Sequence, residues 1–195
     1  MSFLQILQTP AMQPSRRKFL GETGLILSAS AVALLAGCEN LAAAQKNGDG
    51  AAANDVAILN TALGAEREAV AAYQLGADSG LLDVSAKVLA LKFQGHHKAH
   101  ADILAATVSK LGGQPAEVKK KYEFPVEKLK NQVDVLKFAA QLEQGAVSAY
   151  LGAVPLFGNR DLSRAAASIL GDEAMHLAIL RNALGEDPVP SAFVG

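Results

Sequence analysis

Apolar residues recur with helical periodicity in four long segments of this chain, at roughly 55–77, 83–111, 132–157 and 161–184. Each segment is bounded by Gly, Pro, Asn or Asp, the residues that commonly begin and end helices. Alanine and leucine dominate these segments and tryptophan is absent, which favours packed helices over strands. The pattern therefore predicts one all-α domain with four helices.

The connections between the segments predict how the helices are arranged. The loops at 78–82 and 158–160 are short, so each is expected to join two antiparallel helices. The connection at 112–131 is long: about 20 residues can reach about 65 Å, whereas a helix of about 29 residues is about 44 Å long. This connection can run the length of the domain, with its lysine run 119–121 in solvent. We expect a four-helix bundle with one long crossover between the second and third helices.

Residues 1–38 have the composition of an export signal. Arg16 and Arg17 begin the motif RRKFL, and an uncharged, mostly apolar run follows. A membrane-spanning helix needs about 20 residues, more than this run offers. The segment is therefore predicted to be a twin-arginine signal peptide.

The single cysteine, Cys38, ends the sequence LAGC, which resembles the lipobox at which bacterial lipoproteins are cleaved and acylated. We expect lipid attachment at Cys38 and a location in the periplasm or cell envelope. Cleavage after residues 42–44, giving a soluble periplasmic protein, is the alternative. Residues 39–54 read as a flexible linker, 55–187 as the bundle and 188–195 as a C-terminal tail.

Glutamates interrupt the apolar faces of three predicted helices, at Glu66, Glu143 and Glu173. A carboxylate buried without a partner costs several kcal/mol, and three would rival the roughly 5–15 kcal/mol that keeps a domain folded. No Lys or Arg lies near them on those faces. Metal ions, protonated histidines or shared protons are the candidates for the compensating charge.

Histidines and tyrosines accompany these glutamates at regular spacings. His176 follows Glu173 by three residues, and the second segment has His97 and His100 on its inner face. Tyr73 and Tyr150 each follow a glutamate by seven residues. The two halves of the chain thus repeat one pattern, which predicts a duplicated site. Imidazole and carboxylate together suit iron, manganese or zinc.

This pattern resembles the ferritin-like superfamily, in particular the exported ferritin-like domains grouped with desiccation-related proteins, over about residues 54–190. The resemblance implies one or two iron or manganese ions held by side chains from all four helices. The implied ligands are Glu66, His97, His100, Glu143, Glu173 and His176. Tyr73 and Tyr150 either lie beside these ligands or serve as core aromatics.

The second segment departs from the family pattern, because His97 stands where the family has a bridging glutamate. The alternative register would use Gln94 and His97 in place of His97 and His100. His97 lies 31 residues after Glu66 and Gln94 lies 28 after it, while the two glutamates of the second half are 30 apart. The spacing favours His97 and His100. With only three carboxylates, a dinuclear site and a mononuclear or lost site both remain open.

The remaining polar residues are expected to play no part in the site. His96 lies off the inner face, and Arg67, Glu68 and Asp102 are predicted to be solvent-exposed charges. The net charge of −1 and the lack of a basic patch argue against nucleic acid as a partner. With one cysteine, the domain cannot form an internal disulfide or a thiolate metal centre.

These features predict an exported metal-binding protein, with oxidoreductase activity on oxygen, peroxide or ferrous iron as the implied chemistry. The alternative is a non-catalytic envelope protein for stress or desiccation. The expected partners are metal ions, a small oxidant, the membrane through the lipid anchor only, and a second copy of the chain in a homodimer.

Overall fold

The computed structural model describes residues 48–195. The predicted signal peptide at 1–38, the predicted lipidation at Cys38 and most of the predicted linker lie outside the described residues. None of the described helices is long and apolar enough to cross a bilayer.

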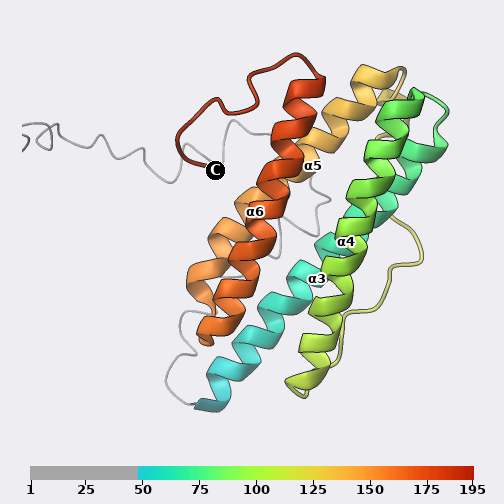
Figure 1. The fold of residues 1–195 in the computed structure, drawn as a ribbon. Helices are drawn as coiled ribbons and strands as arrows, with labels where there is room; N and C mark the ends of the chain where they lie inside the picture. The colour runs from blue at the N-terminus through green and yellow to red at the C-terminus, as the bar shows by residue number, and fades with distance from the viewer. Residues whose placement is uncertain (1–47) are drawn as a thin grey trace, which may run out of the picture.

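Four long helices make up the described domain (Figure 1). They are α3 (Gly48–Asp78), α4 (Val84–Lys110), α5 (Gln132–Ala153) and α6 (Arg160–Ala183). Two short 3₁₀ turns, η3 (Val126–Lys128) and η4 (Val154–Leu156), lie before and after α5. The predicted all-α four-helix bundle is confirmed, and the described residues contain no strand.

Helices α3 and α4 form one antiparallel hairpin and α5 and α6 form the other (Figure 1). The segment between α4 and α5 runs back alongside α4, so α4 and α5 point the same way, as predicted. Asn60 fastens this crossover to α3: its side-chain amide donates to the carbonyl of Gln114 at 2.9 Å and accepts from the backbone N–H of Ala116 at 2.7 Å.

Arg67 was predicted to be a solvent-exposed charge, and this is wrong. Its side chain is half-buried and donates a hydrogen bond to the carbonyl of Ala116 in the crossover. Glu68 is also half-buried, whereas Asp102 is exposed as predicted. Arg67 points outward from α3, but the crossover covers that face, and helical periodicity carries no information about a loop packed from outside.

Helix α3 begins at Gly48 rather than at Asp55, so the predicted linker is helical over 48–54. Asp55 is a common N-cap residue, which suggested a helix start. In the structure it is 4% exposed, and its carboxylate accepts hydrogen bonds from the backbone N–H groups of Gly158 at 2.7 Å and Asn159 at 3.1 Å. Asp55 therefore satisfies the loop between α5 and α6 instead of capping its own helix.

The other helix boundaries lie close to the predicted ones. Asp83 caps α4 by accepting from the N–H of Ala86 at 2.8 Å, and asparagines cap α5 and α6 in the same way. Helix α5 ends at Ala153, four residues before the predicted end at 157, because a 3₁₀ turn containing Pro155 follows it. Proline lacks the N–H that would continue the helix.

Two apolar clusters fill the bundle, one towards each end. The first contains Leu59, Leu63, Ala101, Leu104, Val108, Tyr150, Ala166 and Ile169. The second contains Tyr73, Phe93, Leu136, Ala139 and Leu180. In every helix, the buried glutamates and histidines fall between the positions that belong to these two clusters. The polar centre is therefore enclosed by apolar packing on both sides.

Candidate metal centre

The structure brings all six predicted ligands together in the middle of the bundle, one or two from each helix. Glu143 and Glu173 are 0% exposed, and Glu66, His97 and His176 are 1–3% exposed. The His100 side chain is 15% exposed. The centre is therefore almost completely shielded from water.

Four of these side chains form one group towards the α3–α4 side, namely Glu66, His97, His100 and Glu173. The Nδ1 atom of His97 lies 2.8 Å from Oε2 of Glu66. The Nδ1 atom of His100 lies 3.1 Å from Oε1 of Glu173 and 3.6 Å from Oε2 of Glu66. One ligand atom from each of the four residues lies within 4.8 Å of the others.

A second group lies towards α5 and α6 and consists of His97, Glu143, Glu173 and His176. The Nδ1 atom of His176 lies 3.5 Å from a carboxylate oxygen of both Glu143 and Glu173. The Nε2 atom of His97 lies 3.2 Å from Oε1 of Glu143. His97 and Glu173 belong to both groups, so the two halves of the centre have these two residues in common.

Several buried donor and acceptor atoms at this centre have no hydrogen-bond partner within the described part of the chain. They are Nδ1 of His100, Nδ1 of His176, Oε2 of Glu143 and both carboxylate oxygens of Glu173. Buried polar atoms are normally paired. Two ligands about 2.1 Å from one ion lie about 3.0 Å apart at a right angle and about 3.4 Å apart at a tetrahedral angle. The observed separations match these values, and the donor set fits a transition-metal ion.

The two tyrosines cross over between the hairpins. The hydroxyl of Tyr150 in α5 donates to Oε1 of Glu66 in α3 at 2.5 Å, and the hydroxyl of Tyr73 in α3 donates to Oε1 of Glu143 in α5. Burial and the neighbouring carboxylates raise the pKa of both tyrosines well above the usual value. They are neutral donors that orient the two glutamates, which distinguishes them from core aromatics with no polar contact.

The glutamates and histidines stabilise one another's charges. Burial alone would raise the pKa of Glu66 and Glu143, but hydrogen bonds from the histidines outweigh it and hold both values below the ordinary one. Burial opposes the charge of His97, yet hydrogen bonds to Glu143 and Glu66 raise its pKa to about 10. Burial likewise opposes the charge of His100 and His176, but the nearby carboxylates of Glu66, Glu143 and Glu173 raise the pKa of both histidines to about 9. Without a metal, the centre thus balances its acids with imidazolium groups.

The structure places His97 and His100 on the inner face of α4, beside the buried glutamates. Gln94, the alternative, turns towards α3, where its amide donates to the carbonyl of Val70 at 3.0 Å and to Oε1 of Gln74 at 2.9 Å. Gln94 is itself buried, but its amide hydrogen bonds are made to α3, and it takes no part in the two groups above.

Two further residues that the pattern did not select lie at the edge of the centre. Oδ2 of Asp172 is 3.3 Å from Nε2 of His176 and 3.4 Å from Nε2 of His100. A carboxylate in this position orients imidazole ligands and leaves their other nitrogen free for an ion. His96, which was set aside, lies 3.1 Å from the same oxygen. Both residues stand four positions before a site histidine, a spacing that brings side chains together on a helix.

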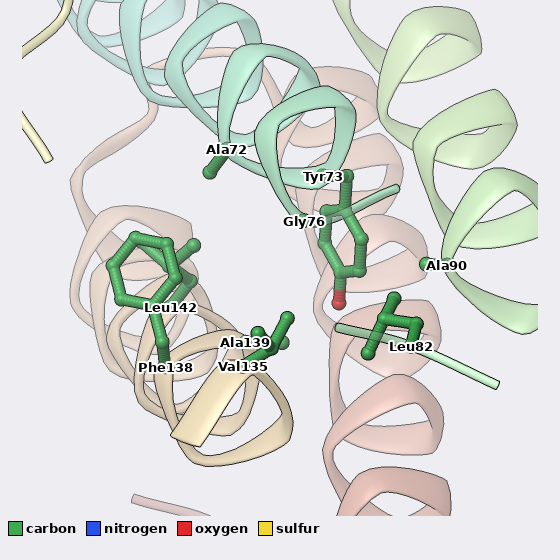
Figure 2. Close-up of a pocket in the computed structure, with 9 residues that line it drawn as sticks. All are labelled: Ala72, Tyr73, Gly76, Leu82, Ala90, Val135, Phe138, Ala139 and Leu142. Carbon is green, nitrogen blue, oxygen red and sulfur yellow. The ribbon is translucent and has the colours of Figure 1, made fainter. Parts of the chain in front are cut away.

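A separate cavity of about 20 Å³ lies at the loop end of the bundle (Figure 2). Tyr73, Leu82, Ala90, Val135 and Phe138 are among its walls. A space of this size admits about one water molecule, and an apolar space of this kind stays dry. It offers no ligand to an ion, so the candidate metal centre is confined to the glutamates and histidines.

Comparisons with known proteins agree with the fold. The chain is similar in structure to a conserved hypothetical protein from Mycobacterium tuberculosis, with 21% identity, a TM-score of 0.64, and coverage of 73% of this chain and 99% of that chain. It is also similar to a ferritin-like, diiron-carboxylate protein from Bacillus anthracis str. Ames, with 20% identity, a TM-score of 0.60, and coverage of 69% and 97%. A comparison with curated proteins found no match. The sequence pattern of the ferritin-like domain matches residues 54–186, and the chain therefore belongs to the ferritin-like domain family.

Proposed function

We propose that this protein is exported and holds one or two iron or manganese ions at the buried centre, where it acts as an oxidoreductase on oxygen, peroxide or ferrous iron. The observation that carries the proposal is the set of unpartnered imidazole and carboxylate atoms at ligand spacing inside the bundle. The similarity to a protein described as a diiron-carboxylate protein supports iron as the metal.

The ligands of such a site would come from the two sides of the centre. Glu66 and His100 would hold one side, Glu143 and His176 the other, and Glu173 belongs to both groups. Redox ions bound there would exchange electrons with a small oxidant. The apolar clusters on both sides exclude water, and the tyrosine hydroxyls and Asp172 keep the donor atoms in place.

The number of ions depends on His97. A neutral imidazole has one free lone pair, so His97 cannot bridge two ions as a carboxylate does. Glu173 is then the one carboxylate common to both groups. Three carboxylates facing two divalent ions leave one positive charge, which a bridging hydroxide would neutralise. A single ion is the other solution.

A second candidate function is a non-catalytic envelope protein with a mononuclear or lost site, serving in stress or desiccation. It is favoured by the position of His97, whose two ring nitrogens lie against Glu66 at 2.8 Å and Glu143 at 3.2 Å. An imidazolium there donates to a glutamate on each side of the centre and offsets one of their two charges without a metal.

Metal analysis together with an assay of oxygen and peroxide consumption separates the two functions, because a mononuclear non-catalytic site binds an ion without consuming either oxidant. Protein purified from its own cell envelope is analysed for iron and manganese, and the metal-free form is titrated with each divalent ion without oxygen. We expect one to two ions per chain, at least tenfold weaker binding in Glu173→Gln, and oxygen or peroxide consumption that this variant loses. Glu127→Gln, at an exposed glutamate far from the centre in sequence, is the control. Metal-free protein that gains no ions on titration would establish the non-catalytic reading.

Export and anchoring are proposed from residues outside the described part of the chain. Cell fractionation and labelling with a fatty-acid analogue test them. Changing both Arg16 and Arg17 to Lys is expected to hold the protein in the cytoplasm, whereas Cys38→Ser is expected to abolish labelling and leave export intact. Export without labelling of the unaltered protein would instead identify the soluble periplasmic form. Sizing of the purified domain tests the proposed homodimer.

A further inference from the structure

A second cluster of ligand atoms lies outside the buried centre. Nδ1 of His96, Oδ2 of Asp172 and Nε2 of His176 form a triangle with sides of 2.9, 3.1 and 3.3 Å. Two helices supply it, with His96 from α4 and the other two residues from α6. These three residues could together hold an ion, and we name them the outer triad.

The hydrogen bonds within the outer triad compete with one another, because three ligand atoms face each other with few hydrogens to share. Each imidazole nitrogen carries at most one hydrogen, yet the Nδ1 of His96 faces both Asp172 and His176. If both histidines donate to Asp172, two N–H groups oppose each other across 2.9 Å. If one histidine donates to the other, that hydrogen no longer serves the carboxylate. A divalent cation satisfies all three atoms at once, and two imidazoles with one carboxylate suit a transition metal.

The outer triad extends from the surface of the bundle to the edge of the buried centre. Side-chain exposure falls from 38% at His96 to 22% at Asp172 and 2% at His176. A groove of about 460 Å³ opens beside it, and Asp172 and His100 form part of its wall. A metal ion with six waters occupies about 180 Å³, so the groove admits a hydrated cation as far as Asp172.

The rings of His100 and His176 lie between Asp172 and the buried glutamates. Each presents Nε2 to Asp172 and Nδ1 to the buried glutamates. Phe93 stacks on His176 with ring centroids 4.0 Å apart, which fixes that ring between the two sides. Because a neutral imidazole offers one lone pair, His176 binds an ion on one side at a time. Occupancy of the outer triad is therefore transient once the buried centre is filled.

We propose that His96, Asp172 and His176 form an outer cation site that captures a divalent transition-metal ion from the groove and passes it to the buried centre. This inference rests on the proposed function, because the ion needs a buried destination. His96 is the residue that distinguishes capture from orientation, since Asp172 also orients the buried histidines and His176 is itself a predicted ligand.

Uptake of Co²⁺ by the metal-free protein tests the proposal. Stopped-flow absorbance measures the rate, and equilibrium dialysis measures the number of ions bound. We expect His96→Ala to slow uptake at least fivefold while binding as many ions at equilibrium as the unaltered protein. Lys92→Ala, one turn earlier on α4 and exposed, is the control and is expected to leave both quantities unchanged. Thermal unfolding of each variant confirms that the bundle is intact.

A second comparison isolates the outer site from the buried one. In Glu173→Gln, which weakens the buried centre, we expect one Co²⁺ to bind still and to be lost when His96→Ala is added. Unchanged uptake by His96→Ala would overturn the outer site and leave the proposed function standing. Fewer ions at equilibrium in His96→Ala would make His96 a permanent ligand and overturn the transfer role. No Co²⁺ binding by the unaltered protein would overturn both proposals.

Discussion

Removing the hydroxyl of Tyr150 tests whether the tyrosines hold the glutamates in place. Tyr150 is 5% exposed, and its hydroxyl is 2.5 Å from Oε1 of Glu66. A hydrogen bond to a charged group contributes about 1.5–3 kcal/mol, and a buried carboxylate oxygen left unpaired costs a similar amount. We expect Tyr150→Phe to lower the free energy of unfolding of the metal-free protein by about 1.5–3 kcal/mol.

Thermal unfolding followed by circular dichroism, in a chelating buffer near pH 6, measures this loss. For a chain of this size, each kcal/mol corresponds to about 2–4 °C, so the midpoint should fall by roughly 3–12 °C. Tyr73→Phe should cost a similar amount, because its hydroxyl makes the equivalent bond to Glu143.

Tyr122→Phe provides the matched control, since Tyr122 lies half-buried in the crossover and packs its ring against Phe124. This variant loses the same hydroxyl oxygen without changing the metal centre. The reasoning would be refuted if Tyr150→Phe and Tyr73→Phe unfolded at midpoints within about 1–2 °C of the Tyr122→Phe midpoint. The tyrosines would then be core aromatics whose hydroxyls contribute nothing to the glutamates.

Three further outcomes are expected. The pKa is raised to about 10 for His97 and about 9 for His176, against 6.5 in the unfolded chain, so the stabilisation from these histidines is complete below pH 6.5 and is lost as the pH rises to 9–10. The pKa values of Glu66 and Glu143 are lowered from 4.5, so the stabilisation from these glutamates is present above pH 4.5 and is lost in acid. Urea unfolding measured across the pH range should therefore show the largest free energy of unfolding between pH 4.5 and pH 6.5. His97→Glu should destabilise the metal-free protein and bring Co²⁺ binding to two ions per chain by dialysis, since it adds a carboxylate able to bridge. Asp55→Ala should lower the free energy of unfolding by about 1–3 kcal/mol in the same urea assay, because two backbone N–H groups lose their acceptor.

Helical periodicity carried enough information to predict the helices and most of the centre. Glu66 lies on the stripe that contains Leu63 and Tyr73, and a buried stripe in a bundle can face only the interior. Once four such stripes converge, their polar members must meet. The choice of His97 and His100 over Gln94 and His97 came instead from the spacing, since His97 follows Glu66 by 31 residues, close to the 30 residues between Glu143 and Glu173.

Features that depend on contacts between distant segments could not be predicted in this way. Asp55 carries a local helix-start signal, yet it bonds to residues more than one hundred positions later. Asp172 lies about 100° around the helix from Glu173, so a stripe reading assigns it to the surface. Its importance arises from His96 and His100 on another helix, which only the three-dimensional arrangement brings to the same oxygen.

The imidazole of His97 changes what metal binding requires of this bundle. A centre with four carboxylates needs external positive charge to be buried, so its folding is tied to its metal. Here the raised pKa values of three histidines let imidazolium groups offset Glu66, Glu143 and Glu173, so the chain can fold before it meets an ion. An incoming ion must then displace protons rather than fill an unbalanced site. The affinity of the centre for the ion should therefore rise steeply with pH. Release of protons on addition of metal would distinguish a centre that binds metal from one that does not.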